Sequence, residues 1–163
     1  MNPPSDALAR VIRLFEGLGI DDCARLGAYY RADARFKDPF NEVSGVPAIE
    51  AVFRHMFVQL ESPRFRITGR VEDPAAREAV LFWEFLFRFR RSPITGSAAG
   101  EQRITGSTHL QFDEQGLIGL HRDYWDAAEE LYEKLPILGG LMRWLKRRNA
   151  VGPVPAGTRS AGQ

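Results

Sequence analysis

Residues 64–72 read Arg-Phe-Arg-Ile-Thr-Gly-Arg-Val-Glu, and residues 79–90 read Ala-Val-Leu-Phe-Trp-Glu-Phe-Leu-Phe-Arg-Phe-Arg. The first stretch alternates strictly and the second carries large apolar residues at every second position, which is the period of a β-strand. Asp73-Pro74 lies between the two stretches and predicts a turn. We therefore expect two long neighbouring strands, the second with one aromatic-rich face made of Ala79, Leu81, Trp83, Phe85, Phe87 and Phe89.

The chain beyond residue 90 continues as strands and then changes to a helix. Strands are predicted near residues 103–112 and 117–125, with a hairpin turn at 113–116, and such short connections are typical of an antiparallel meander. Asp126 and Glu129 have the spacing of a capping box and predict a C-terminal helix that Pro136 interrupts. The Gly, Pro, Ala and Ser composition of residues 150–163 predicts a disordered tail.

Before residue 64 the apolar residues follow a helical period. One helix is predicted up to Gly17, a second from Asp21 with Tyr30 on its apolar stripe, and a third from about Pro47 to Leu60. Residues 35–38 are expected to be extended, because Asp38 precedes a proline. Helices followed by strands and a closing helix indicate an α+β fold and not a βαβ fold.

Composition limits the classes of function. A chain of 163 residues with 44% apolar residues is the size of one domain, and a formal net charge of +1 does not favour binding to nucleic acid. Cys23 is the only cysteine, which excludes an intrachain disulfide and a multi-cysteine metal site, and a cytoplasmic location is expected. Neither an export signal nor 18 consecutive apolar residues are seen, so we expect no integral membrane segment.

Two segments carry a resemblance to a known family, together with the order of the elements. They are Tyr-Arg-Ala-Asp-Ala-Arg-Phe-Lys-Asp-Pro-Phe at residues 30–40 and Ile-Gly-Leu-His-Arg-Asp-Tyr-Trp-Asp at residues 118–126. The chain thereby resembles the nuclear transport factor two-like superfamily, which includes SnoaL-like cyclases, ketosteroid isomerases and limonene epoxide hydrolases. The resemblance implies a cone-shaped, curved antiparallel sheet wrapped around three N-terminal helices, with a C-terminal helix. It places a single domain at residues 1–149 and a pocket at one end of the cone.

The resemblance to each enzyme family is incomplete. Asp38-Pro39 resembles the base of ketosteroid isomerases, but the positions of their two oxyanion-hole donors hold Leu14 and Thr108. The segment from Arg122 to Asp126 is similar to the last strand of limonene epoxide hydrolases, in which the first aspartate activates water. SnoaL-like cyclases need chiefly one aspartate in an apolar cavity, and Asp123 fits that need.

The candidate catalytic residues are therefore Asp123 as acid or base, His121 as its partner, and Asp38 and Glu84 as secondary carboxylates. His121 and Asp123 are two residues apart on a strand, so both side chains are expected on one face. Two alternatives involve no catalysis: Glu84 would form an ion pair with an arginine across strands, and Asp38 would cap a turn. The resemblance implies pocket positions at Tyr30, Phe36, Phe82, Thr108 and Trp125.

No metal or cofactor is expected. A facial iron triad that begins with His121 and Asp123 needs a second histidine, ordinarily downstream, and none follows; His55 and His109 are expected at the surface. Nucleotide-binding glycine motifs are also missing. We expect either a metal-free enzyme that isomerises, cyclises or hydrates a small apolar compound, or a noncatalytic binding module for a small hydrophobic ligand. A homodimer through the outer face of the sheet is expected, and an interaction role of the C-terminal helix is a third possibility.

Overall fold

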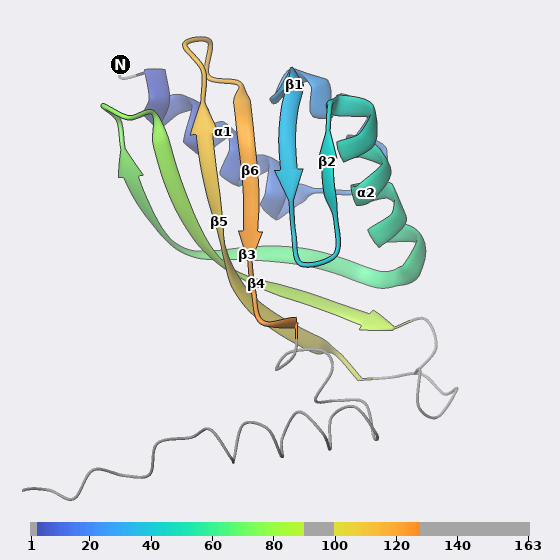
Figure 1. Cartoon of the computed structure of the whole chain (residues 1–163). Coiled ribbons are helices and arrows are strands. Elements are labelled where there is room, and N and C mark those ends of the chain that lie inside the picture. The colour runs from blue at the N-terminus through green and yellow to red at the C-terminus, as the bar shows by residue number, and fades with distance from the viewer. Residues whose placement is uncertain (1–2, 90–99, 128–163) are drawn as a thin grey trace, which may run out of the picture.

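The computed structural model describes residues 3–89 and 100–127 as two helices, one 3₁₀ helix and six strands (Figure 1). Their bounds, in chain order, are α1 (Pro3–Gly17), the 3₁₀ helix η1 (Ile20–Ala28), β1 (Tyr30–Lys37), β2 (Glu42–Ser44), α2 (Val46–Gln59), β3 (Leu60–Asp73), β4 (Glu78–Phe89), β5 (Gln102–Phe112) and β6 (Ile118–Tyr124). The predicted α+β class is confirmed. The predicted C-terminal helix and the predicted tail lie outside the described residues.

The six strands form one sheet in the order β2-β1-β6-β5-β4-β3. The meander predicted from β3 to β6 is confirmed, since each strand pairs antiparallel with the next. The β1–β6 pair is parallel, and it brings β1 beside the last described strand. Figure 1 shows that β3 and β4 bend strongly, so the sheet is curved and does not close.

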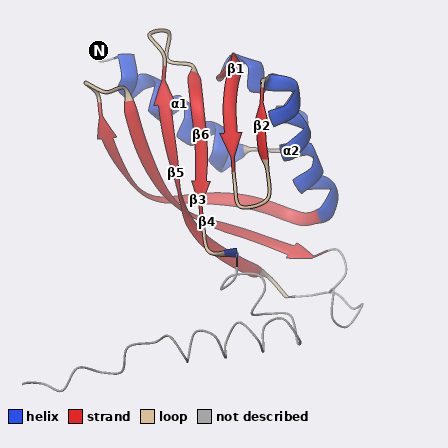
Figure 2. Ribbon diagram, viewed as in Figure 1, coloured by secondary structure: helices blue, strands red, loops and turns tan. Residues whose placement is uncertain are grey.

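The alternation in β4 gives the sheet an inner face and an outer face. Trp83, Phe85 and Phe87 are buried on the inner face, whereas Phe82 on the outer face is 45% exposed. Both helices pack on the inner face, because the ring of Phe15 in α1 lies 6.1 Å from that of Phe53 in α2 and 6.0 Å from that of Phe65 in β3. Figure 2 shows these helices beside the sheet.

The helix predicted from Asp21 differs from the structure at its end. η1 ends at Ala28, and Tyr30 is the first residue of β1 instead of the last turn of a helix. The backbone there pairs with β6, where the N–H of Ile118 donates to the carbonyl of Tyr29 at 2.8 Å. This pairing with a distant strand outweighs the helical spacing of the local apolar residues. The short strand β2 was not predicted and forms by pairing with β1.

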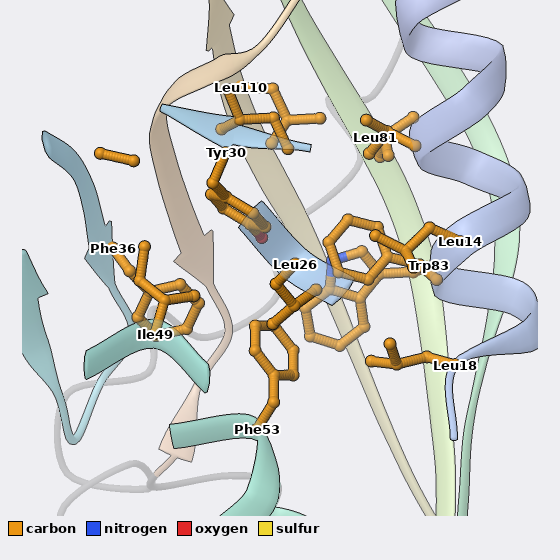
Figure 3. Close-up of a cluster of buried hydrophobic side chains, with 14 of the residues drawn as sticks. Leu14, Leu18, Leu26, Tyr30, Phe36, Ile49, Phe53, Leu81, Trp83 and Leu110 are labelled. Carbon is orange, nitrogen blue, oxygen red and sulfur yellow. The ribbon is translucent and has the colours of Figure 1, made fainter. Parts of the chain in front are cut away.

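The core combines side chains from every layer. In Figure 3, labelled side chains from α1, η1, α2 and the strands, among them Leu14, Leu26 and Phe53, point into one cluster around Trp83. Gly106 on β5 allows this position of Trp83, because a Cβ at Gly106 would lie 2.5 Å from the indole ring. Side chains therefore fill the centre of the inner face. A cavity lies farther along β4, toward Phe89.

Candidate functional site

A cavity of about 400 Å³ lies at one end of the inner face. Its walls come from α2, the turn after β1, and β3, β4 and β5, and all four aromatic side chains at odd positions of β4 from Trp83 to Phe89 contribute. Phe36 of β1 and Trp125 after β6 also line it. The alternating aromatic pattern of β4 thus forms one wall of a cavity that suits an apolar ligand.

Asp123 lies at the inner end of this cavity, on β6 opposite Thr108 of β5. The hydroxyl of Thr108 donates to Oδ1 of Asp123 at 2.5 Å. The same hydroxyl oxygen accepts a hydrogen bond from the indole N–H of Trp83 at 2.8 Å. Thr108 can do both, because a hydroxyl group has one proton to donate and lone pairs that accept, whereas the Trp83 N–H can only donate and a carboxylate oxygen can only accept.

A second pair of hydrogen bonds reaches Asp123 from β1 through His121. Nε2 of His121 lies 2.9 Å from Oδ1 of Asp123, and Nδ1 of His121 lies 2.7 Å from the hydroxyl of Tyr30. Both Tyr30 and His121 are almost fully buried. Burial, and after it the negative charge of Asp123, raise the pKa of Tyr30 well above its usual value of 10.0. Tyr30 therefore keeps its proton.

One tautomer of neutral His121 satisfies both of its neighbours. With the proton on Nε2, His121 donates to Asp123, and Nδ1 accepts from the Tyr30 O–H. Oδ1 of Asp123 then accepts from both His121 and Thr108, whereas its Oδ2 receives no hydrogen bond from residues 3–89 and 100–127. The side chain of Asp123 is 15% exposed. The arrangement can hold a carboxylate still and leave one oxygen available to a bound molecule.

Asp38 lies at the mouth of the cavity and caps the turn after β1. Its Oδ1 accepts the backbone N–H groups of Phe40 at 2.7 Å and Asn41 at 2.6 Å, and its carboxylate also accepts the Asn41 side-chain amide. These bonds match the turn-capping alternative of the sequence analysis. Asp38 also lines the cavity, so its turn-capping bonds do not remove it from the cavity wall.

Glu84 and Phe82 lie on the outer face and do not reach the cavity. Glu84 forms ion pairs with Arg66 of β3 and, at 3.6 Å, with Arg103 of β5. The expectation that Glu84 and Phe82 join the site is corrected by the strand period, since even-numbered residues of β4 point away from Trp83. For Glu84 the ion-pair alternative describes the structure.

The remaining predicted pocket residues have two roles: some line the cavity, and others belong to the hydrogen-bond network of Asp123. Phe36 is a wall residue whose ring lies 4.8 Å from the ring of His121. Tyr30 and Thr108 support Asp123 from outside the large cavity. Three polar residues that the sequence did not predict also line the cavity: Asn41, His55 and Gln59. His55 and Gln59 are four residues apart on α2, and this spacing was the only available signal.

No three histidine, cysteine, aspartate or glutamate side chains come together as a metal site within the described ranges. No helix in those ranges is both long enough and apolar enough to cross a membrane.

The family model of the SnoaL-like domain matches residues 11–121, which is more than half of the chain. Asp123 lies two residues beyond this match. No curated protein has a significantly similar sequence.

Similar solved structures carry the same fold. A candidate SnoaL-like polyketide cyclase from Shewanella putrefaciens is 16% identical with a TM-score of 0.63, over 80% of this chain and 97% of its own. An LEH-like epoxide hydrolase from M. tuberculosis is 16% identical with a TM-score of 0.59, over 89% of this chain and 96% of its own.

A hypothetical protein with a ketosteroid isomerase-like fold from Catenulispora acidiphila, in complex with trimethylamine, is 14% identical with a TM-score of 0.62. It covers 77% of this chain and 88% of its own. Identities this low show the shared fold, and the family follows from the match over residues 11–121. The chain belongs to the SnoaL-like domain family.

Proposed function

We propose that the chain binds a small, largely apolar molecule in the aromatic cavity and that Asp123 transfers a proton to or from it. The observation that carries this proposal is the asymmetry of the Asp123 carboxylate. Oδ1 is held by Thr108 and His121, and Oδ2 has no hydrogen bond from the described residues. A fixed base next to bound substrate needs no reorganisation before the proton moves.

One proton transfer serves the three reaction classes expected for this fold. In an isomerisation or a cyclisation, Oδ2 takes a proton from a carbon of the substrate and returns it, or another, at a second atom. In the hydrolysis of an epoxide, Oδ2 takes a proton from a water molecule while the water oxygen bonds to a ring carbon. The epoxide C–O bond at that carbon breaks, and the epoxide oxygen takes a proton from solvent to give the diol. The similarity to a candidate cyclase and to an epoxide hydrolase supports these classes as candidates.

A noncatalytic binding module is the second candidate, and the distribution of hydrogen-bond donors favours it. Among the described residues around Asp123, the donors Thr108, His121 and Trp83 are all committed to the carboxylate network. No described donor there is free to stabilise an oxyanion, which supplies a large part of the rate enhancement in many enzymes. In this reading Asp123 orients a ligand without chemistry.

The test uses 5-nitrobenzisoxazole, a flat apolar probe. A base removes its C–H proton, the N–O bond breaks, and a coloured cyanophenolate forms. We expect the purified full-length chain to open this probe with saturation kinetics, and we expect tert-butylbenzene to inhibit competitively. If NMR shows the probe in the cavity and its opening is no faster than with free acetate at equal carboxylate concentration, proton transfer is contradicted and the binding module is favoured.

A further inference from the structure

The charge of the cavity lining is one-sided. Two carboxylates, Asp38 and Asp123, line the cavity, and among its described lining residues there is no lysine and no arginine. His55 at the mouth is the only other titratable side chain among them. The chain as a whole has a formal net charge of +1, so this negative lining is not a consequence of an acidic composition.

Two cationic side chains of the neighbouring surface contact groups other than the cavity carboxylates. Lys37 and Arg122 line a shallow depression on the other side of Asp38 and Asp123. Lys37 pairs with Glu42 at 2.5 Å, and the guanidinium of Arg122 lies over the ring of Tyr124, 4.7 Å from its centre. In the part of the chain that the structure describes, neither cavity carboxylate forms an ion pair with a lysine or an arginine.

The rest of the lining is rich in aromatic rings. Seven phenylalanines and two tryptophans line the cavity: Phe36, Phe40, Phe53, Phe65, Trp83, Phe85, Phe87, Phe89 and Trp125. Phe40 and Trp125 lie edge to face at the Asp38 end, with centroids 5.3 Å apart. Aromatic faces carry partial negative charge and attract organic cations, most strongly where water is excluded.

We infer that the ligand of this cavity is an amine, that is, an apolar body with an ammonium group placed between the aromatic rings and the carboxylate of Asp123. The inference rests on the proposed function for the location of the site and adds the chemical class of its ligand. A cation gains from both the rings and the two carboxylates. An anion is repelled by both, and a neutral hydrocarbon offers no partner to Oδ2 of Asp123, the oxygen that Thr108 and His121 do not contact.

The experiment compares two molecules of nearly equal shape. Phenyltrimethylammonium and tert-butylbenzene differ in charge, and neither can donate an N–H or O–H hydrogen bond, so the comparison isolates the cation. Binding to the full-length chain is measured by NMR titration at low salt, with benzenesulfonate as the anion. We expect phenyltrimethylammonium to bind at least tenfold more tightly than tert-butylbenzene, with resonances of Trp83 and Trp125 shifting, and benzenesulfonate not to bind.

Two variants identify the carboxylate. Asp123→Asn is expected to weaken the binding of phenyltrimethylammonium at least tenfold. Its affinity for tert-butylbenzene is expected to stay within twofold of the wild-type value. Asp33→Asn removes an equal charge from an exposed aspartate that pairs with Arg31 and does not line the cavity, and it is expected to change neither affinity. The comparison in the wild-type chain needs no variant, so it stands even if Asp123→Asn unfolds the chain.

Equal or tighter binding of tert-butylbenzene would overturn the amine inference and leave proton transfer to an apolar substrate intact, since the benzisoxazole assay measures that separately. An equal loss of phenyltrimethylammonium binding in Asp33→Asn and Asp123→Asn would also overturn it, because general electrostatic attraction would then explain the affinity. The amine inference would also be overturned if neither phenyltrimethylammonium nor tert-butylbenzene bound to the chain.

Discussion

Replacement of Asp123 with asparagine is expected to reduce the turnover of 5-nitrobenzisoxazole by about 10²–10⁴-fold, the usual contribution of a positioned acid or base. Asparagine has nearly the same shape, and its amide oxygen can still accept from Thr108 and His121, whose donors lie 2.5 Å and 2.9 Å from Oδ1 in the present structure. Its amide nitrogen takes the place of Oδ2 and cannot accept a proton. The measurement is kcat/KM from the absorbance of the product.

Glu84→Gln is the matched control for this variant. It also neutralises a carboxylate that the sequence made a catalytic candidate, but Glu84 faces the outer side and pairs with Arg66 and Arg103. We expect its kcat/KM to stay within about twofold of the wild type, since it lines neither the cavity nor the Asp123 network. A large loss of kcat/KM in Glu84→Gln would contradict the assignment of Asp123 as the base. So would an Asp123→Asn variant that keeps more than a tenth of the wild-type kcat/KM.

Replacement of His121 with alanine is expected to lower the free energy of unfolding by about 2–5 kcal/mol. His121 is 2% exposed, and its ring packs on Phe15, Tyr30, Phe36 and Phe53. Alanine leaves a void between these rings and removes the acceptor of the Tyr30 hydroxyl, which is then buried without a partner. Urea unfolding measures the change.

A second histidine provides the comparison for this variant. His109→Ala removes a half-buried imidazole that pairs with Glu78 at 3.1 Å on the outer face, and its cost is expected to be below about 1 kcal/mol because the pair is partly solvated. Tyr30→Phe deletes only the hydroxyl and is expected to cost about 1–3 kcal/mol. Equal costs for His121→Ala and His109→Ala would show that the buried network contributes no special stability.

The sequence was sufficient where a local period decides the structure. The two-residue period of β4 predicted its aromatic face, and two residues of spacing placed His121 and Asp123 on one side of β6, where the structure brings them within 2.9 Å. The same period already separated Glu84 from Trp83. Glu84 became a site candidate only because the resemblance suggested converging carboxylates, and the orientation of its side chain contradicts that suggestion.

Contacts between distant segments could not be predicted in this way. Tyr30 joins the Asp123 network through His121, which is 91 positions away in the sequence, and does so because β1 pairs in parallel with β6. No pattern near Tyr30 encodes that pairing, and its helical spacing suggested the wrong element. The three polar lining residues come from a turn and from α2, which meet only in the folded chain. The homodimer, the single domain over residues 1–149 and the cytoplasmic location stay predictions.

Oδ1 of Asp123 accepts from His121 in the proposed site, and the ring nitrogens of His121 report this bond. In ¹⁵N NMR spectra of the wild-type chain, we expect a protonated, pyrrole-type Nε2 for His121, because only a protonated Nε2 donates to the carboxylate. A proton on Nδ1 alone, with an unprotonated, pyridine-type Nε2, would contradict the assignment, because Nε2 could then not donate to Asp123.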